Sequence, residues 1–186
     1  LLINKFGINC TLALHTNLPW VHFDLMPGSF LRKILTKKMM ELSIFSSNKL
    51  IVNSYYAKRE LVKKLKIKKK VYVIYLGIDE KFLQKKTVSN INNFKYKNYI
   101  LSVTSCVKYH NILNILESFK KVKNMNKFFN LRLVLVLQVL DKDYFNQVNS
   151  FIAKNFNIND VIIFHNLELK YLPKLYSKSN LYIFSS

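Results

Sequence analysis

Three polar residues of this sequence are the clearest candidates for binding a ligand: Lys108, His110 and Asn111. They follow an apolar segment, 99–104, that is predicted as a strand, and they stand directly before a segment with the apolar period of a helix. The first turn of a helix leaves backbone N–H groups unpaired and carries the positive end of the helix dipole, so it attracts anions. A lysine and a histidine at such a helix start predict a turn that binds phosphate groups.

His15 is a second candidate, because it stands at the end of another apolar segment, 9–15. A histidine at the end of a strand can hydrogen-bond a sugar hydroxyl or a phosphate, whether the ring is charged or neutral. A loop histidine that bonds only to the backbone is the alternative interpretation.

The sequence of 186 residues has a net charge of +20, and only part of this charge is taken as evidence for an anionic partner. Of the 30 basic residues, Arg32, Arg59 and Arg132 are arginines and the rest are lysines. Lysine occurs here with abundant Asn, Ile, Phe and Tyr, a composition that an AT-rich genome imposes on its proteins. We therefore interpret most of the charge as solvated surface and the rest as affinity for a nucleotide, a membrane surface or nucleic acid. The lysine run 66–70 lacks interleaved aromatic residues, which argues against nucleic acid.

Several classes of protein are excluded by simple counts. The longest apolar segment, 131–140, is shorter than the ~18 residues of a membrane-spanning helix, and it contains Arg132 and Gln138. The first residues lack the pattern of a signal peptide. Cys10 and Cys106 are far apart, which predicts free thiols in a reducing compartment, no disulfide framework and no metal site. We therefore expect a cytoplasmic protein without a metal.

The elements that position these residues alternate along the chain. Ser29 and Ser54 are expected to be the N-caps of the first two helices. Strands are predicted at 9–15, 49–53, 71–76, 99–104, 131–137, 161–164 and 181–184, and helices at 29–46, 54–65, 112–123, 142–155 and 173–178. This order predicts an α/β fold with parallel sheets, whose ligands lie beyond the carboxyl ends of the strands. Two lobes, 1–79 and 99–186, are expected on either side of a connector at 80–98.

Five segments in register resemble the GT-B glycosyltransferases of the retaining family four. They are Leu14-His15, Ile51-Val-Asn-Ser54, Val73-Ile-Tyr-Leu-Gly-Ile-Asp79, Val103-Thr-Ser-Cys-Val-Lys-Tyr-His-Asn111 and Leu175-Tyr-Ser-Lys-Ser-Asn-Leu-Tyr-Ile-Phe-Ser185. The resemblance implies a GT-B fold of two Rossmann-like lobes with parallel sheets, both incomplete in this chain. Residues 1–79 are then the back half of the acceptor-side lobe, and 99–186 the front half of the nucleotide-sugar side.

The same resemblance implies an activity and its partners. A sugar is transferred, with retention, from a nucleotide-diphosphate sugar to a saccharide or lipid-linked acceptor in the synthesis of surface polysaccharide or glycolipid. The nucleotide sugar is a co-substrate, and no separate cofactor is expected. The acidic loop that grips the donor in this family lies beyond Ser186, so residues 1–186 are expected to show no transferase activity by themselves. A basic, non-catalytic α/β domain that binds nucleic acid or anionic membrane remains the alternative.

The resemblance also assigns roles to individual residues. His15 becomes the catalytic residue of the acceptor side, and it is expected to face the turn 104–111 across a cleft. The donor is bound by Thr104, Ser105, Lys108, His110, Asn111, Asn166 and Leu167, the last two at the nucleobase, unless they form only a surface turn. The sequence departs from the family pattern where His110 replaces a lysine and Thr104 a glycine. A free imidazole is mostly neutral at pH 7, although a bound diphosphate favours its cation.

The predicted helix 29–46 carries an apolar stripe beside a basic face. Such a helix suits peripheral contact with the anionic inner face of the cytoplasmic membrane. An ordinary helix that packs its apolar stripe into the core is the alternative.

Overall fold

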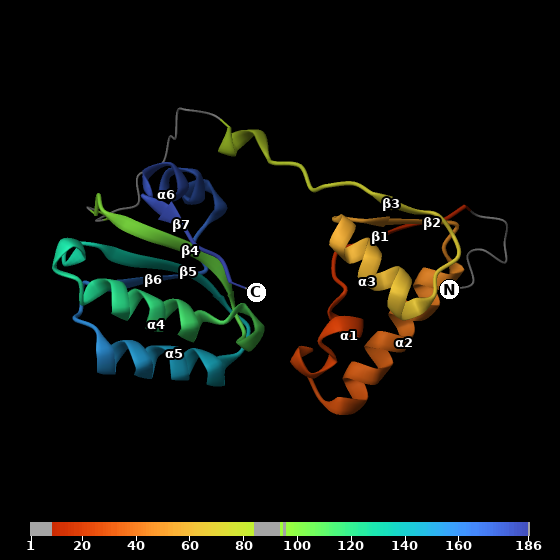
Figure 1. Ribbon diagram of the computed structural model, residues 1–186, viewed down its shortest axis with the longest axis horizontal. Helices are drawn as coiled ribbons and strands as arrows, with labels where there is room; N and C mark the ends of the chain where they lie inside the picture. Colours follow the sequence, from red (N-terminus) through yellow and green to blue (C-terminus); the bar gives the residue numbers. More distant parts are fainter. Residues whose placement is uncertain (1–8, 84–93, 95, 186) are drawn as a thin grey trace. The chain divides into compact units, whose positions relative to one another are not determined.

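The computed structural model describes residues 9–83, 94 and 96–185 (Figure 1). The chain divides into two compact units, Leu1–Ile78 and Asp79–Ser186. Each unit contains its own sheet, in which all paired strands run parallel. The predicted α/β fold with parallel sheets is therefore confirmed. Residues 84–93 and 95 of the predicted connector lie outside the described residues.

The first unit has a three-stranded sheet in the order β1-β2-β3. Its elements are β1 (Thr11–Leu14), α1 (Leu18–Val21), a 3₁₀ turn at Phe23–Leu25, α2 (Phe30–Ser46), β2 (Lys49–Val52), α3 (Tyr55–Leu65) and β3 (Val71–Val73). Strand β3 ends at Val73 rather than at the predicted residue 76, because its partner β2 ends opposite it at Val52. The short helix α1 was not predicted; Pro19 fits in its first turn, where no backbone donor is needed.

Both predicted N-caps of the first unit are confirmed. Ser29 Oγ accepts a hydrogen bond from the Arg32 backbone N–H at 3.4 Å, and Ser54 Oγ accepts one from Ala57 N–H at 3.1 Å. Each serine thereby pairs one of the orphan donors that a helix start leaves. The starts of α2 and α3 follow from these two residues.

The core of the first unit forms where α2 and α3 pack against β2. Its buried residues are Leu14, Trp20, Ile44, Leu50, Val52, Leu61, Ile67 and Val71. Helix α2 contributes Ile44 as its fully buried residue. The apolar stripe predicted for this helix is exposed instead, with 71% of Phe30, 76% of Leu31 and 59% of Leu35 open to solvent. The alternative of a stripe packed into the core does not describe this structure.

The second unit has a four-stranded sheet in the order β6-β5-β4-β7. Its strands are β4 (Tyr99–Cys106), β5 (Arg132–Val139), β6 (Val161–His165) and β7 (Leu181–Tyr182), and its helices are α4 (Ile112–Lys123), α5 (Lys142–Asn155) and α6 (Leu172–Lys178). Short 3₁₀ turns lie at Glu80–Phe82, Lys108–His110, Asn126–Phe128 and Leu169–Tyr171. Strand β4 runs two residues past the predicted 104, because it pairs with β5 as far as Cys106 and Val139.

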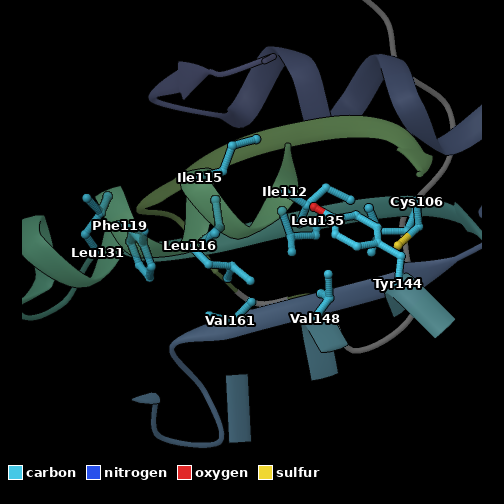
Figure 2. Close-up of a cluster of buried hydrophobic side chains, with 12 residues drawn as sticks. Cys106, Ile112, Ile115, Leu116, Phe119, Leu131, Leu135, Tyr144, Val148 and Val161 are labelled. Carbon is cyan, nitrogen blue, oxygen red and sulfur yellow. The ribbon is translucent and has the colours of Figure 1, made fainter. Parts of the chain in front are cut away.

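Side chains of β5 alternate between two cores, one on each face of this sheet. Leu133, Leu135 and Leu137 join the core under α4 and α5. Figure 2 labels Leu135 in this core. Val134 and Val136 join the core under α6, on the opposite face (Figure 1). This alternation is the period of two that a strand buried on both faces requires.

Strand β4 lies at the point where the strand order of the second unit reverses. The chain proceeds from β4 outward to β5 and β6, and it then returns to place β7 on the other side of β4. In open parallel sheets, ligands bind beyond the carboxyl ends of the strands at such a reversal. The segment after β4 is therefore the place to examine for a site.

Candidate functional site

The turn after β4 holds His110 by its Nδ1 atom. This atom lies 2.6 Å from Thr104 Oγ1 and 2.9 Å from the Ser105 carbonyl oxygen. The ring packs against the ring of Phe184, at 5.5 Å between centroids, and Ser185 Oγ donates to the His110 carbonyl oxygen at 2.9 Å. The structure thus brings the predicted residues at 104, 105 and 110 together with the segment that follows β7.

Asn111 connects this turn to helix α4. Its φ of 51° lies in the left-handed region, which asparagine tolerates better than most residues. Its carbonyl oxygen accepts the backbone N–H groups of Asn114 and Ile115, at 3.1 and 3.4 Å, and so begins the helix. Its side chain makes no cap. Asn111 therefore shapes the turn through its backbone, while its exposed amide remains open to a ligand.

A tyrosine from α5 already accepts a hydrogen bond from the first turn of α4. The Leu113 backbone N–H donates to the Tyr144 hydroxyl at 3.3 Å, and Tyr144 is buried. Burial raises the pKa of Tyr144, and its hydrogen bonds from the Leu113 and Ile112 N–H groups oppose that rise. Part of the anion-binding capacity predicted for this helix start is thus used inside the protein. A phosphate at the turn has to rely mainly on side chains, and Lys108 is exposed there.

A cavity of about 480 Å³ opens at the carboxyl ends of β4, β5 and β6. Its lining residues are Val103, Thr104, Ser105, Val136, Leu137, Gln138, Asn166, Leu167, Leu169 and Leu172. Mostly apolar walls with a few polar groups, and a volume within ~300–1,000 Å³, are typical of small-molecule sites. Four predicted donor-binding residues, at 104, 105, 166 and 167, therefore line one cavity. Lys108, His110 and Asn111 are not among its lining residues and lie on the adjoining turn.

Gln138 is a lining residue that the sequence reasoning missed. Its Oε1 accepts a hydrogen bond from Ser105 Oγ at 3.4 Å, and its side chain is exposed at the end of β5. The available signal was its place: a polar residue near the end of an apolar strand next to the strand that carries Thr104 and Ser105.

Asn166 supports the predicted turn after β6. Its φ of 47° is left-handed, and its N–H donates to the Leu137 carbonyl oxygen at 3.1 Å. This bond ties the turn to the end of β5 and holds Asn166 and Leu167 against the cavity.

His15 belongs to the first unit and directly follows β1. Its side chain is exposed, and its carbonyl oxygen accepts a hydrogen bond from Asn53 Nδ2 at 3.4 Å. The predicted position at the end of a strand is thus confirmed. The cleft between His15 and the turn 104–111 stays a prediction.

No cluster of three or more metal-ligating side chains occurs among the residues that the structure describes. Cys10 and Cys106 are free thiols. Burial, with a smaller contribution from Asp141, raises the pKa of Cys106 to about 11, so this thiol is a poor nucleophile. Within the same ranges, no helix is long and apolar enough to cross a bilayer.

Comparison of the sequence with protein-family models and with curated proteins finds no match. The structure, in contrast, matches solved glycosyltransferases. A trehalose-6-phosphate synthase, OtsA, aligns with a TM-score of 0.69 and 12% identity over 98% of this chain. The E. coli protein bound with UDP-2-fluoro glucose aligns with a TM-score of 0.70 and 12% identity, also over 98% of this chain. TarM aligns over 97% of this chain, with a TM-score of 0.63 and 11% identity.

The chain spans about half of the length of the synthases, 48% of each, and 32% of TarM. At such low identity the likeness concerns the fold. The order of parallel strands and helices described above therefore has the architecture of the GT-B glycosyltransferases, with two Rossmann-like units.

Proposed function

We propose that this chain carries parts of both lobes of a glycosyltransferase that moves a sugar from a nucleotide-diphosphate donor to a saccharide or lipid-linked acceptor. The observation that carries the proposal is the convergence of Thr104, Ser105 and Asn166 at one cavity, beside the turn of His110. This cavity lies at the strand-order reversal of a GT-B fold. The structure of similar fold that is bound with UDP-2-fluoro glucose supports a nucleotide sugar as the donor.

In this proposal the cavity binds one part of the donor and the turn binds another. The apolar walls around Leu167 and Leu172 accept the nucleoside, with the Gln138 and Asn166 amides as hydrogen-bonding groups. Lys108 and His110 contact the diphosphate, whose charge grows as the sugar leaves. The second unit is thus the donor side, and the first unit, with His15, the acceptor side.

Retention of configuration belongs to the same proposal. Reactions of this kind use the charge of the donor's own phosphate and the cations around it, and they require no protein nucleophile. The proposed role of His15 is to hydrogen-bond the sugar at the end of β1. Synthesis of surface polysaccharide or glycolipid, in the cytoplasm, is the setting that we propose for this activity.

Calorimetric titration with UDP-glucose and GDP-mannose tests the donor site. We expect Leu167→Trp to weaken binding at least ~10-fold, because the larger side chain fills a cavity that the nucleoside needs. Ile158→Trp is the matched control, since Ile158 is 93% exposed and does not line the cavity.

The outcomes separate this proposal from its alternative. Two results together support the nucleotide-sugar site. Leu167→Trp reduces the binding of either donor, and a single-stranded oligonucleotide does not displace that donor. Failure of both donors to bind, together with tight binding of the oligonucleotide, would identify a basic nucleic-acid-binding domain instead.

We further propose that α2 contacts an anionic membrane surface. Its exposed apolar side chains are Phe30, Leu31, Ile34, Leu35, Met39, Leu42 and Phe45. Lys37 lies at the edge of this stripe, whereas Lys38 lies within it, four residues from both Ile34 and Leu42. The Lys38 side chain is 70% exposed, and its Nζ lies 3.4 Å from Glu41 Oε2. Apolar burial at the headgroup boundary and attraction of lysines to anionic lipids combine in this kind of binding. A lipid-linked acceptor would then be met at the membrane.

Sedimentation with liposomes tests this contact. We expect the chain to sediment with vesicles that contain anionic lipid, and the triple variant Lys33, Lys37 and Lys38→Glu to remain in solution. Lys121, Lys142 and Lys154→Glu makes the same change of charge on the second unit and is expected to sediment like the unmodified chain. Equal sedimentation with neutral and anionic vesicles would exclude an electrostatic membrane contact.

A further inference from the structure

The hydrogen bonds of His110 define which tautomer its ring adopts. A carbonyl oxygen only accepts hydrogen bonds, so the 2.9 Å contact between Nδ1 and the Ser105 carbonyl is favourable when Nδ1 carries a hydrogen. The Thr104 hydroxyl donates to the same carbonyl at 3.4 Å, which leaves Thr104 Oγ1 free to accept from Nδ1 at 2.6 Å. The Ser105 carbonyl thus favours the Nδ1–H tautomer, and the Thr104 hydroxyl supports it by accepting from Nδ1 while it donates to that carbonyl.

This tautomer makes Nε2 the atom that meets a ligand. In the neutral ring with Nδ1–H, the Nε2 atom carries a lone pair, which repels a phosphate oxygen. In the cation Nε2–H donates a charge-assisted hydrogen bond to that oxygen. The hydrogen bonds found for this ring in the described part of the chain are those of Nδ1.

The groups that face the ring come from three elements. Strand β4 supplies Thr104 and Ser105, the 3₁₀ turn supplies Tyr109 at 4.4 Å between ring centroids, and the segment after β7 supplies Phe184 at 5.5 Å. Lys108 is the charged residue of the same turn. A carboxylate is not among the contacts that the structure gives this ring within the described ranges. The bound phosphate is then the anion that favours the imidazolium.

We propose that His110 binds the donor diphosphate only as its imidazolium, and that Thr104 and the Ser105 carbonyl act as positioning groups that fix the tautomer. The inference rests on the proposed donor site. Donor binding then takes up a proton at any pH at which the free ring is neutral. Affinity is therefore expected to fall as pH rises, with a limiting slope of ~10-fold per pH unit.

Calorimetry over about pH 5.5–8.5, in two buffers of different ionisation enthalpy, measures both affinity and proton uptake. UDP-glucose and GDP-mannose serve as probes, because the charge of their diphosphate diesters stays constant over this range. Binding to the unmodified chain should be at least ~10-fold tighter at the acid end, with proton uptake at the alkaline end. His110→Lys should bind without proton uptake and with no such pH dependence, and His110→Gln should bind weakly throughout.

Nitrogen-15 NMR of the imidazole rings reads the tautomer directly, without a ligand. At the alkaline end we expect the Nδ1–H form for His110 in the unmodified chain, a mixture of tautomers in Thr104→Val, and recovery of the Nδ1–H form in Thr104→Ser. An Nε2–H ring in the unmodified chain would overturn the inference. So would donor binding that proceeds without proton uptake and tolerates His110→Gln, although the donor site itself would then stand. Absence of donor binding in every variant at every pH would remove the donor site and this inference together.

Discussion

At the scale of single residues, Tyr144 explains why the start of α4 is less open to anions than its sequence indicates. Its hydroxyl accepts the Leu113 N–H from a position 31 residues away in the chain. A buried backbone donor that loses its partner costs about 1–3 kcal/mol. The same hydroxyl therefore stabilises the fold at the point where the predicted phosphate turn begins.

Tyr144→Phe is expected to lower the free energy of unfolding by about 1–2 kcal/mol, since it leaves the partly buried Leu113 N–H without this partner. Chemical denaturation followed by circular dichroism measures this loss. Tyr56→Phe is a control with the same change, because Tyr56 is 53% exposed. Equal stability of the two variants would mean that the Tyr144 hydroxyl does not support the helix start.

Tyr99 makes stability depend on alkaline pH. Its hydroxyl donates to the Leu175 carbonyl oxygen at 2.8 Å, and burial raises its pKa to about 12. An unfolded tyrosine ionises near ~10, so at pH values between about 10 and 12 the unfolded chain releases a proton that the folded chain keeps. This contribution to stability is complete below the unfolded pKa and is lost as pH rises through the folded one.

Tyr99→Phe is expected to flatten the fall in unfolding free energy between about pH 9.5 and 11.5, because it removes the group whose pKa differs between the two states. Denaturation curves at several pH values measure the slope. Tyr176, whose pKa is also raised to about 12 by burial, should preserve part of the fall. A slope identical to that of the unmodified chain would contradict the assignment to Tyr99.

At the scale of elements, helix α2 is closed at its carboxyl end by a lysine from beyond α3. Lys69 Nζ donates to the carbonyl oxygens of Ile44 and Ser47, and also to that of Phe45 at 3.3 Å. The last carbonyls of a helix lack backbone partners within it, and a cation complements the negative end of its dipole. The Ile44 carbonyl also accepts a hydrogen bond from the Ser47 hydroxyl at 2.9 Å. Burial lowers the pKa of Lys69, which is the cost of holding the ammonium group there.

Lys69→Met is expected to destabilise the first unit by about 1–2 kcal/mol, because the last carbonyls of α2 lose a charged donor. Hydrogen exchange of α2 amides, followed by mass spectrometry, measures the effect where it arises. Lys68→Met removes an exposed neighbouring lysine and serves as the control. If the α2 amides are equally protected from hydrogen exchange in both variants, the Lys69 side chain does not stabilise the end of the helix.

At the scale of the whole molecule, the two units have separate cores. Leu50 is fully buried in the core of the first unit, and Leu135 is fully buried in a core of the second. The two units are therefore expected to unfold as separate cooperative blocks.

Leu50→Ala should lower protection from hydrogen exchange in residues 9–78 and leave 96–185 nearly unchanged, whereas Leu135→Ala should do the reverse. Each truncation of a buried leucine costs about 2–5 kcal/mol of the unit that contains it. Exchange measured peptide by peptide compares the two blocks in one experiment. Equal loss of protection in both blocks from either variant would show that the chain unfolds as one cooperative unit.

The sequence by itself determined the predicted strands and the longer helices and their order, but not the short helix α1. The caps Ser29 and Ser54 act within a single helix turn, where local preference decides. The parallel sheets followed from that alternation of strands and helices. For the same reason the ends of β3 and β4 differed from the prediction, since pairing with a neighbouring strand decides where a strand stops.

The tertiary structure alone decided how the candidate site is equipped. The Tyr144 hydroxyl at the start of α4, the Gln138 amide in the cavity and the approach of Phe184 to His110 join residues that are far apart in the chain. The face of α2 that packs on the first unit was decided in the same way, since an amphipathic period marks two faces without saying which one a neighbour covers. Such contacts arise only when strands and helices pack, because they depend on the geometry between elements and not on the preferences within one.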